Sequence, residues 1–315
     1  MRFSIDPWDP TYGNSLDAEM GASSAQIDAA VEVPIEQWGP IDPSPGVLPP
    51  SAVLFVDGVR RVDAQVWVDE ADGAASAALC ASYAAGVVCC CAEGAHLLAA
   101  HVRRGLFTTT ENGADVVTSA GTYRSTRTAP RPDIAPVQVL SLALQRDLAD
   151  VELVAADAAR EEHTADDDLL VVDGPLRGRQ HLPRVIGFVK SHRSDYLPAQ
   201  LGAVVGRLQA GQRTPVFRLG SSWERHTWYL RLPCAPGAPW AGVVRVECSA
   251  ELTVAAAIAL ADVSQVTLVR YASTEYKDSR APQNLYPIAG LERALRRRLG
   301  EPSVLYRALR RAAAA

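Results

Sequence analysis

The segment 168–176, Asp-Leu-Leu-Val-Val-Asp-Gly-Pro-Leu, constrains the fold more than any other stretch of the chain. Its run of apolar residues lies between an acidic run and a Gly-Pro turn, a pattern that predicts a buried strand. The strand delivers the carboxylate of Asp173 to its C-terminal end, where Gly174 permits a sharp turn of the backbone. The segment 53–58, Val-Leu-Phe-Val-Asp-Gly, repeats this design with Asp57.

Two buried strands that both end in Asp-Gly can lie side by side in one sheet. Asp57 and Asp173 would then be within reach of a shared divalent cation, since like charges this close repel unless a metal ion or a proton lies between them. The alternative is that each aspartate only caps the turn after its strand, as Asp-Gly often does. The recurrence of the pattern favours the metal-site interpretation.

The remaining pattern predicts an α/β fold, with a mixed sheet flanked by helices. Residues 1–50 are rich in Pro, Asp, Ser and Gly and predict an irregular arm, so that the main domain spans 51–315. Apolar residues recur at helical spacing over 137–160, which predicts a long helix. Further helices are expected at 197–208, 254–261, 288–299 and 303–311, and a helical turn at 27–33. Further strands are expected at 62–68 (after a turn at 58–61), 86–90, 101–107, 185–190, 215–219, 228–232, 242–248 and 266–271.

Composition excludes several classes of protein. The 31 basic and 36 acidic residues give a net charge of −5, which argues against a polybasic protein but permits a local basic groove. The six cysteines, three of them consecutive, do not resemble a disulfide framework, and no CxxC pair or Cys/His spacing typical of zinc is present. The N-terminus shows no signal peptide, and no stretch reaches the roughly 18 apolar residues that a membrane span requires. We therefore expect a cytoplasmic protein with reduced cysteines.

Ribonuclease H-like folds have the element order predicted here. It consists of a strand, a hairpin and a strand, followed by a long helix and another strand that ends in an acidic residue. The carboxylates of these folds hold one or two cations, and oxygen-only ligands suit Mg²⁺ or Mn²⁺. A third ligand is expected from the helix at 137–160, where Glu152 lies nearest the edge of the apolar stripe and Asp150 and Asp147 are alternatives. Lys190 ends its strand as the aspartates do, and it is a candidate for holding the scissile phosphate.

Other candidates would bind nucleic acid rather than metal. Arg60 and Arg61 follow the first Asp-Gly and would reach phosphate from the turn, or form a charged hairpin tip. His192, close to Lys190, is a weaker candidate. The segment 270–287 is dense in tyrosine, basic and amide groups, including Arg280 and Tyr286, and suits base stacking and phosphate binding or a structured surface loop. The arginines of the two terminal helices predict a basic face for nucleic acid or for an acidic partner.

These motifs resemble those of the NurA nucleases, which partner the hexameric ATPase HerA in processing DNA ends. The resemblance covers roughly residues 50–300. It depends on Val-Asp57-Gly-Val-Arg-Arg, on Leu-Val-Val-Asp173-Gly-Pro-Leu, on Gly187-Phe-Val-Lys190 and on a late Tyr286-Pro287. It implies a ribonuclease H-like fold and a Mn²⁺-dependent (or Mg²⁺-dependent) nuclease that cleaves single- and double-stranded DNA. It also implies a homodimer that docks on a HerA-type ATPase for end resection in DNA repair.

Carried over to this chain, the resemblance makes Asp57 and Asp173 the two strand aspartates and Glu152 the helix glutamate that bind metal. Lys190, the candidate for holding the scissile phosphate, joins them as an expected catalytic residue. The chain has Glu292 near the place where archaeal members tend to carry a histidine, so either Glu292 is an additional ligand or Lys190 and His192 replace that group. Two alternatives stay open. One is a catalytically silent dimeric adaptor of a DNA-translocating ATPase, and the other is a ribonuclease H-like nuclease that cleaves RNA or hybrids.

Overall fold

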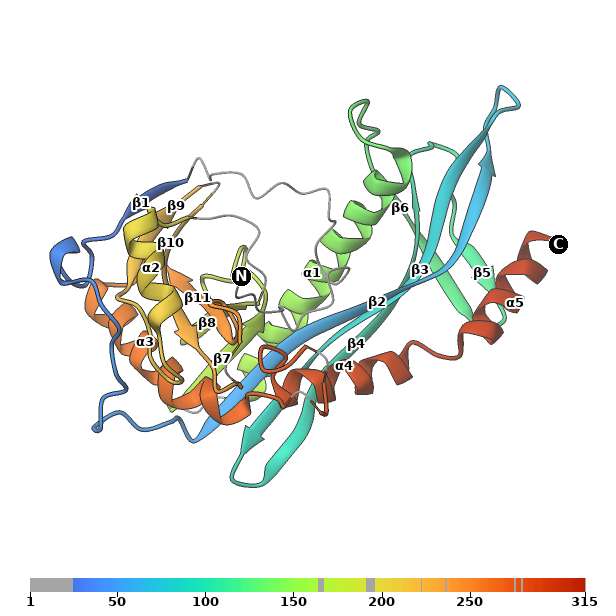
Figure 1. Ribbon diagram of the computed structural model, residues 1–315. Coiled ribbons are helices and arrows are strands. Elements are labelled where there is room, and N and C mark those ends of the chain that lie inside the picture. Colours follow the sequence, from blue (N-terminus) through green and yellow to red (C-terminus); the bar gives the residue numbers. More distant parts are fainter. Residues whose placement is uncertain are drawn as a thin grey trace. The chain divides into compact units, whose positions relative to one another are not determined.

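The structure is a computed structural model that describes residues 25–163, 167–190, 196–221, 223–235, 237–274, 276–278 and 280–314. The chain forms two compact units. Unit 1 comprises Met1–Phe55, Cys89–Ala95 and Ala165–Ala289, and unit 2 comprises Val56–Val88, His96–Thr164 and Gly290–Ala315. Mostly antiparallel strands flanked by helices make up the molecule (Figure 1), which confirms the predicted α/β class and mixed sheet.

The strands of unit 1 lie in the order β1-β9-β10-β11-β8-β7. Strands β7 and β8 pair in parallel, and the remaining pairs between β8 and β1 are antiparallel. The apolar residues of β7 and β8 are almost fully buried, as is typical of parallel strands. The strands span β1 Gln26–Asp28, β7 Asp168–Asp173, β8 Val185–Val189, β9 Phe217–Gly220, β10 Glu224–Arg231 and β11 Val243–Ser249.

The described part of the N-terminal segment packs on unit 1. The predicted helical turn at 27–33 is wrong, because β1 pairs with β9 and only a 3-10 turn, Ile35–Gln37 (η1), follows. Trp38 joins the hydrophobic cluster under α2 (Ala199–Arg207), and its indole N–H donates to the Ala29 carbonyl at 2.7 Å. A buried Arg213 binds Glu32 at 2.7 Å and Asp262 at 2.6 Å, which attaches this segment to the body of the unit.

Helix α3 (Val254–Leu268) continues into a 3-10 turn, Val269–Tyr271 (η2), so the strand predicted at 266–271 is wrong. The β-branched residues there favoured a strand, but burial against the sheet overrides that preference. The segment Val254–Tyr271 is also long and apolar enough to cross a membrane, with a mean hydropathy of 1.3, contrary to the sequence expectation. Core helices share this composition, and α3 packs on β10 and β11, where Trp228 Nε1 donates to Ser264 Oγ at 3.0 Å.

Unit 2 contains the longest strands, in the order β2-β3-β4-β6-β5. They span β2 Ala52–Asp69, β3 Ala75–Cys91, β4 Gly94–Thr108, β5 Val116–Thr118 and β6 Gly121–Arg127, and Figure 1 shows β2 to β4 as long blue and teal ribbons. The turn predicted at 58–61 is wrong. Strand β2 continues through Gly58, and the chain reverses only after Glu70, whose N–H donates to the Ala74 carbonyl at 2.8 Å.

The helices of unit 2 confirm the sequence prediction. Helix α1 (Pro136–Glu162) buries an apolar stripe that includes Leu140, Leu144 and Leu148. Helix α4 (Tyr286–Arg298) contacts β3, because Leu291 and Leu295 lie against Gly86. Helix α5 (Pro302–Ala313) packs along β5 through buried residues that include Leu305 and Leu309.

Candidate functional site

Asp173 lies at the end of β7, as the sequence predicts. The chain turns at Gly174, whose φ of 102° lies in the left-handed region that favours glycine. The next residues are fixed by a fully buried carboxylate, since Leu176 N–H donates to Glu247 Oε1 at 2.8 Å. Gly187 permits this approach, because a Cβ there would lie 3.0 Å from the Glu247 side chain and 2.9 Å from the Leu176 nitrogen.

Glu247 is held by two buried arginines. Its Oε2 lies 2.6 Å from Arg245 Nη1 and 3.1 Å from Arg225 Nε. Burial lowers the pKa of Arg225, an effect that the carboxylate opposes and the neighbouring Arg245 reinforces. This ionic cluster positions the turn that carries Asp173.

Lys190 is the basic partner of Asp173. Its Nζ donates to Asp173 Oδ2 at 2.6 Å and to Asn284 Oδ1 at 2.9 Å. The two charged side chains are only 11% and 15% exposed, respectively, so water screens their attraction weakly. The end of the Asp-Gly strand and the Gly-Phe-Val-Lys segment, which the sequence singles out as separate motifs, therefore meet in the structure.

Two residues of this network escaped the sequence analysis. Asn284 donates through Nδ2 to Asp278 Oδ2 at 2.7 Å, and the backbone N–H of Arg280 donates to Asp278 Oδ1 at 2.9 Å. Although burial raises the pKa of Asp278, these hydrogen bonds and the Arg280 guanidinium outweigh it, and the pKa lies below its usual value. Arg280, a predicted DNA ligand, is thus engaged with Asp278.

The same loop presents an aromatic and cationic surface. Lys277 Nζ lies 5.3 Å from the centre of the Tyr276 ring and 5.4 Å from that of Tyr286. The Tyr286 hydroxyl is hydrogen-bonded to Thr274 Oγ1 at 2.8 Å, and Tyr276 is 82% exposed. The tyrosine-rich composition of 270–287 predicted this surface.

In unit 2, the structure brings Asp57 together with Glu292. The two side chains are 8% and 7% exposed, and a carboxylate oxygen of each lies within 4.8 Å of the other. Asp57 lies in the middle of β2, where its Oδ1 accepts the Gly58 N–H at 2.7 Å, and Glu292 lies on α4. Arg296, one turn further along the helix, is 3.5 Å from Glu292.

Glu152 is also buried, but it contacts a different side of the strand. A Cβ at Gly58 would lie 2.6 Å from Glu152 Oε1. Because consecutive residues of a strand point to opposite faces, this contact places Glu152 on the Gly58 face of β2 rather than the Asp57 face. Asp147, another acid of α1, contacts Thr126 and Tyr83, and burial raises its pKa.

The remaining predicted DNA ligands have local partners or lie outside the described residues. Arg60 donates to Ser141 Oγ at 3.1 Å, and Arg61 donates to Asp63 at 2.9 Å and to the Gly300 carbonyl at 2.8 Å. Both belong to β2 rather than to a turn. His192 lies outside the described residues.

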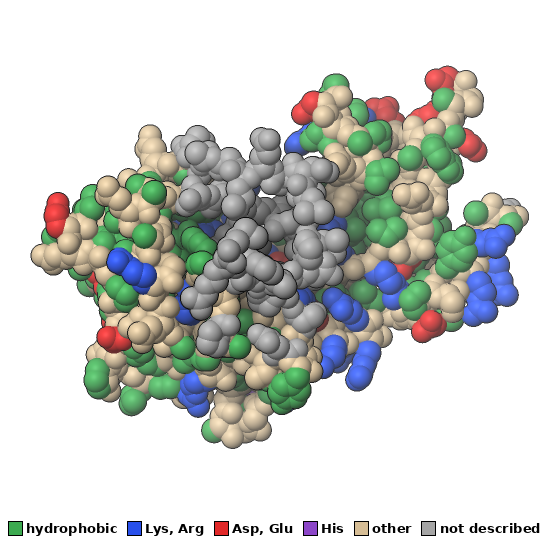
Figure 2. All heavy atoms as spheres, in the orientation of Figure 1, with side chains coloured by type: hydrophobic (Ala, Val, Ile, Leu, Met, Phe, Trp, Pro, Cys, Tyr) green, Lys and Arg blue, Asp and Glu red, His purple; other side chains and the backbone are tan. Residues whose placement is uncertain are grey.

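The terminal helices carry the predicted basic face. Figure 2 shows Lys and Arg side chains gathered over α4 and α5. The exposed arginines of these helices are Arg293, Arg296, Arg297, Arg298, Arg307, Arg310 and Arg311.

The Asp57 and Glu292 pair fits a divalent cation. Both donors are carboxylate oxygens, which are the ligands that Mg²⁺ and Mn²⁺ prefer, and both are largely removed from bulk water. Two carboxylates at this separation repel each other unless a cation or a proton lies close by. Burial strengthens that repulsion, since it lowers the local dielectric constant.

No protein-family model matches this sequence, and no curated protein sequence matches it. Among solved structures, the chain is similar to the NurA nuclease from Sulfolobus solfataricus, with 11% identity and a TM-score of 0.44 over 84% of this chain and 85% of that chain. It is also similar to endonuclease V from Bacillus subtilis, with 13% identity and a TM-score of 0.33 over 82% of this chain and 84% of that chain. At these values neither likeness assigns a role to a residue of this chain.

Proposed function

We propose that this chain is a metal-dependent nuclease that hydrolyses phosphodiester bonds in DNA. The observation that carries the proposal is the buried pair of Asp57 and Glu292, whose carboxylate oxygens lie within 4.8 Å of each other. Two acids that are buried side by side attract positive charge, as the position of Arg296 at 3.5 Å from Glu292 illustrates. Their oxygens are also suited to a divalent cation, and phosphodiester hydrolysis is a reaction that such cations catalyse.

We assign Asp57 and Glu292 as ligands for Mn²⁺ or Mg²⁺, and we propose Asp173 as a third ligand because it repeats the Asp-Gly pattern. When bound, the cation would polarise the phosphodiester and favour attack by water. Glu152, expected as a ligand from the sequence, remains a candidate. Comparing Glu152→Gln with Glu292→Gln decides between the two acids.

Lys190 is proposed to bind the scissile phosphate. Its ammonium group is oriented by Asp173 and Asn284 at 2.6 and 2.9 Å, so little side-chain freedom remains to be lost when a phosphate binds. A fixed positive charge also stabilises the negative charge that develops in the transition state. Asp278 does not contact the phosphate in this proposal, and its role is to orient Asn284.

We propose that the tyrosines beside Lys277 stack on bases, and that the arginines of α4 and α5 contact the phosphate backbone. Stacking on aromatic rings is tolerant of sequence, and arginine contacts to phosphate make binding dependent on salt. Both fit a nuclease that processes DNA ends without reading their sequence. We extend the proposal to a cytoplasmic homodimer whose partner is a HerA-type ATPase.

The test is digestion of labelled linear DNA with Mn²⁺, Mg²⁺ or EDTA. We expect cleavage by the wild type only with a cation, and a loss on the order of 10²–10³-fold in Asp57→Asn, Glu292→Gln and Asp173→Asn. Glu161→Gln is the matched control, because Glu161 is an exposed acid near the end of α1. Cleavage unchanged in Asp57→Asn would refute the proposed site. If the wild type cleaves no DNA even with a cognate ATPase present, the adaptor function replaces the nuclease.

A further inference from the structure

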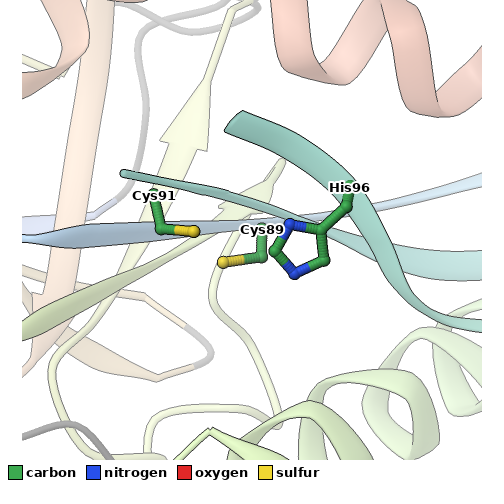
Figure 3. Close-up of side chains that lie close together, drawn as sticks. All are labelled: Cys89, Cys91 and His96. Atoms are coloured by element: carbon green, nitrogen blue, oxygen red, sulfur yellow. The ribbon is translucent and has the colours of Figure 1, made fainter. Parts of the chain in front are cut away.

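A second group of metal-ligating side chains lies on the hairpin formed by β3 and β4. Strand β3 ends at Cys91, and β4 begins at Gly94. Cys89 and Cys91 are two residues apart in a strand, so their side chains point to the same face. His96 lies on the returning strand, and Figure 3 shows its imidazole ring beside the two sulfur atoms. One ligand atom from each residue lies within 4.8 Å of the others.

The arrangement depends only on the hairpin. All three residues lie in the stretch 89–96, and β3 and β4 are neighbours in the sheet. The sequence pattern Cys-x-Cys followed by His96 differs from the CxxC spacing of common zinc motifs, because it is the pleat of a strand, rather than a turn, that brings the two sulfur atoms together.

The surroundings suit a metal ligand set with one accessible side. Cys89 is 1% exposed, Cys91 is half-buried and His96 is exposed. The sulfur of Cys89 is shielded from water, whereas the exposed imidazole of His96 lies where an ion can enter from solvent. Three protein ligands also leave a fourth tetrahedral position for water or for another donor.

We propose that Cys89, Cys91 and His96 bind Zn²⁺. Thiolate and imidazole are ligands that zinc prefers, with metal–sulfur distances of about 2.3 Å and metal–nitrogen distances of about 2.0–2.1 Å. Such bonds require ligand atoms somewhat closer than the 4.8 Å upper limit observed here, a difference that small side-chain rotations provide. The bound ion cross-links the ends of β3 and β4 and stabilises the hairpin.

This site is chemically distinct from the carboxylate pair. Sulfur and nitrogen ligands select zinc and softer cations, whereas the oxygen ligands Asp57 and Glu292 select Mg²⁺ or Mn²⁺. The zinc proposal therefore stands whether or not the chain is a nuclease.

The experiment is metal binding by the whole chain of 315 residues, purified under reducing conditions and freed of metal. Co²⁺ is the spectroscopic probe, because thiolate ligation produces a charge-transfer absorption that carboxylates do not. We expect this absorption in the wild type, its displacement by Zn²⁺, and an affinity at least about 100-fold weaker in Cys89→Ser and His96→Ala. His96→Ala is the variant that tests the site without disturbing the core, since His96 is exposed.

Cys90→Ser is the matched control, because Cys90 belongs to the same strand but points to the other face. It should retain the cobalt absorption, as should Asp57→Asn. Absence of thiolate absorption in the wild type, or equal affinity in the wild type and His96→Ala, would overturn the proposal. Loss of the signal in Cys90→Ser would overturn it too, since it would assign binding to a different set of thiols.

Discussion

The ion pairs of Asp173 and Glu247 in unit 1 and the pair of Asp57 and Glu292 in unit 2 arrange buried acids in contrasting ways. In unit 1, Asp173 lies against Lys190 at 2.6 Å, and Glu247 lies against Arg245 at 2.6 Å. In unit 2, Asp57 and Glu292 bring two carboxylates within 4.8 Å of each other. Pairs of opposite charge hold a structure together, whereas a pair of like charges gains stability when a cation binds.

For Glu247, which is held by two arginines, the difference indicates a role in maintaining the fold, whereas for Asp57 and Glu292 it indicates a role in binding a ligand. Substitution of Glu247 should lower the free energy of unfolding. Substitutions in the acidic pair of unit 2 should abolish cation binding, and the removal of repulsion should offset part of the cost of the lost contacts with Gly58 and Arg296. Stability and cation binding, measured on the same variants, test the contrast directly.

The largest loss of stability is expected for Glu247→Ala. The substitution leaves Arg225 and Arg245 buried without their carboxylate, and removal of one partner from a buried ion pair costs about 3–5 kcal/mol. Urea denaturation followed by circular dichroism measures this loss. Glu251→Ala is the control, because Glu251 is exposed in the turn after β11. A loss below about 1 kcal/mol in Glu247→Ala would contradict the structural role of the cluster.

Cation binding should stabilise the wild type and leave the acidic-pair variants unaffected. At a cation concentration of about 100 times Kd, the expected gain is about 2.7 kcal/mol. Thermal unfolding with and without Mn²⁺ measures it. In Asp57→Asn and Glu292→Gln the gain should disappear. Loss of the gain in Glu152→Gln instead would identify Glu152 as the ligand.

The sequence predicted the elements that have a strong local signal. Strand β7 with Asp173 at its end, strand β8 leading to Lys190, and the long helix α1 follow from apolar runs and helical periodicity. The position of Asp57 within its strand was wrong, because Asp-Gly also fits the interior of a long strand such as β2. No local signal distinguishes a glycine that turns the chain from one that only makes room for a neighbour.

Long-range contacts were the part that the sequence could not supply. Asn284 and Asp278 reach Lys190 through side-chain hydrogen bonds, which follow no periodicity. The sequence offers Glu292 as an additional ligand only through its place in a family pattern, and it is the structure that places it beside Asp57. The sequence favoured the acids of α1 as ligands because they lie near the apolar stripe of that helix. The face on which each acid lies, however, depends on how the helix packs.

The orientation of Lys190 is tested by Asn284→Ala. The substitution removes the acceptor at 2.9 Å from Lys190 and a donor to Asp278, and hydrogen bonds to charged groups contribute about 1.5–3 kcal/mol each. We expect cleavage about 10-fold slower, which corresponds to about 1.4 kcal/mol in the activation barrier. Wild-type cleavage rates in Asn284→Ala would show that Asp173 alone orients the lysine.

The smallest expected effects are two dependences of stability on pH, with opposite signs in the two units. In unit 1, burial lowers the pKa of His226 from its usual 6.5, and the nearby Arg218 adds to this. Below pH 6.5 the unfolded chain binds the proton more readily than the folded one, so stability falls as the pH falls.

In unit 2, burial raises the pKa of Asp147 above its usual 3.8, so stability falls as the pH rises above that value. Thermal unfolding between about pH 4 and pH 8, the range in which these two side chains titrate, measures both pH dependences. His226→Gln should flatten the acid side of the profile, while Asp147→Asn should raise stability at neutral pH. If both variants changed the profile in the same direction, the contrast between the buried groups of the two units would be wrong.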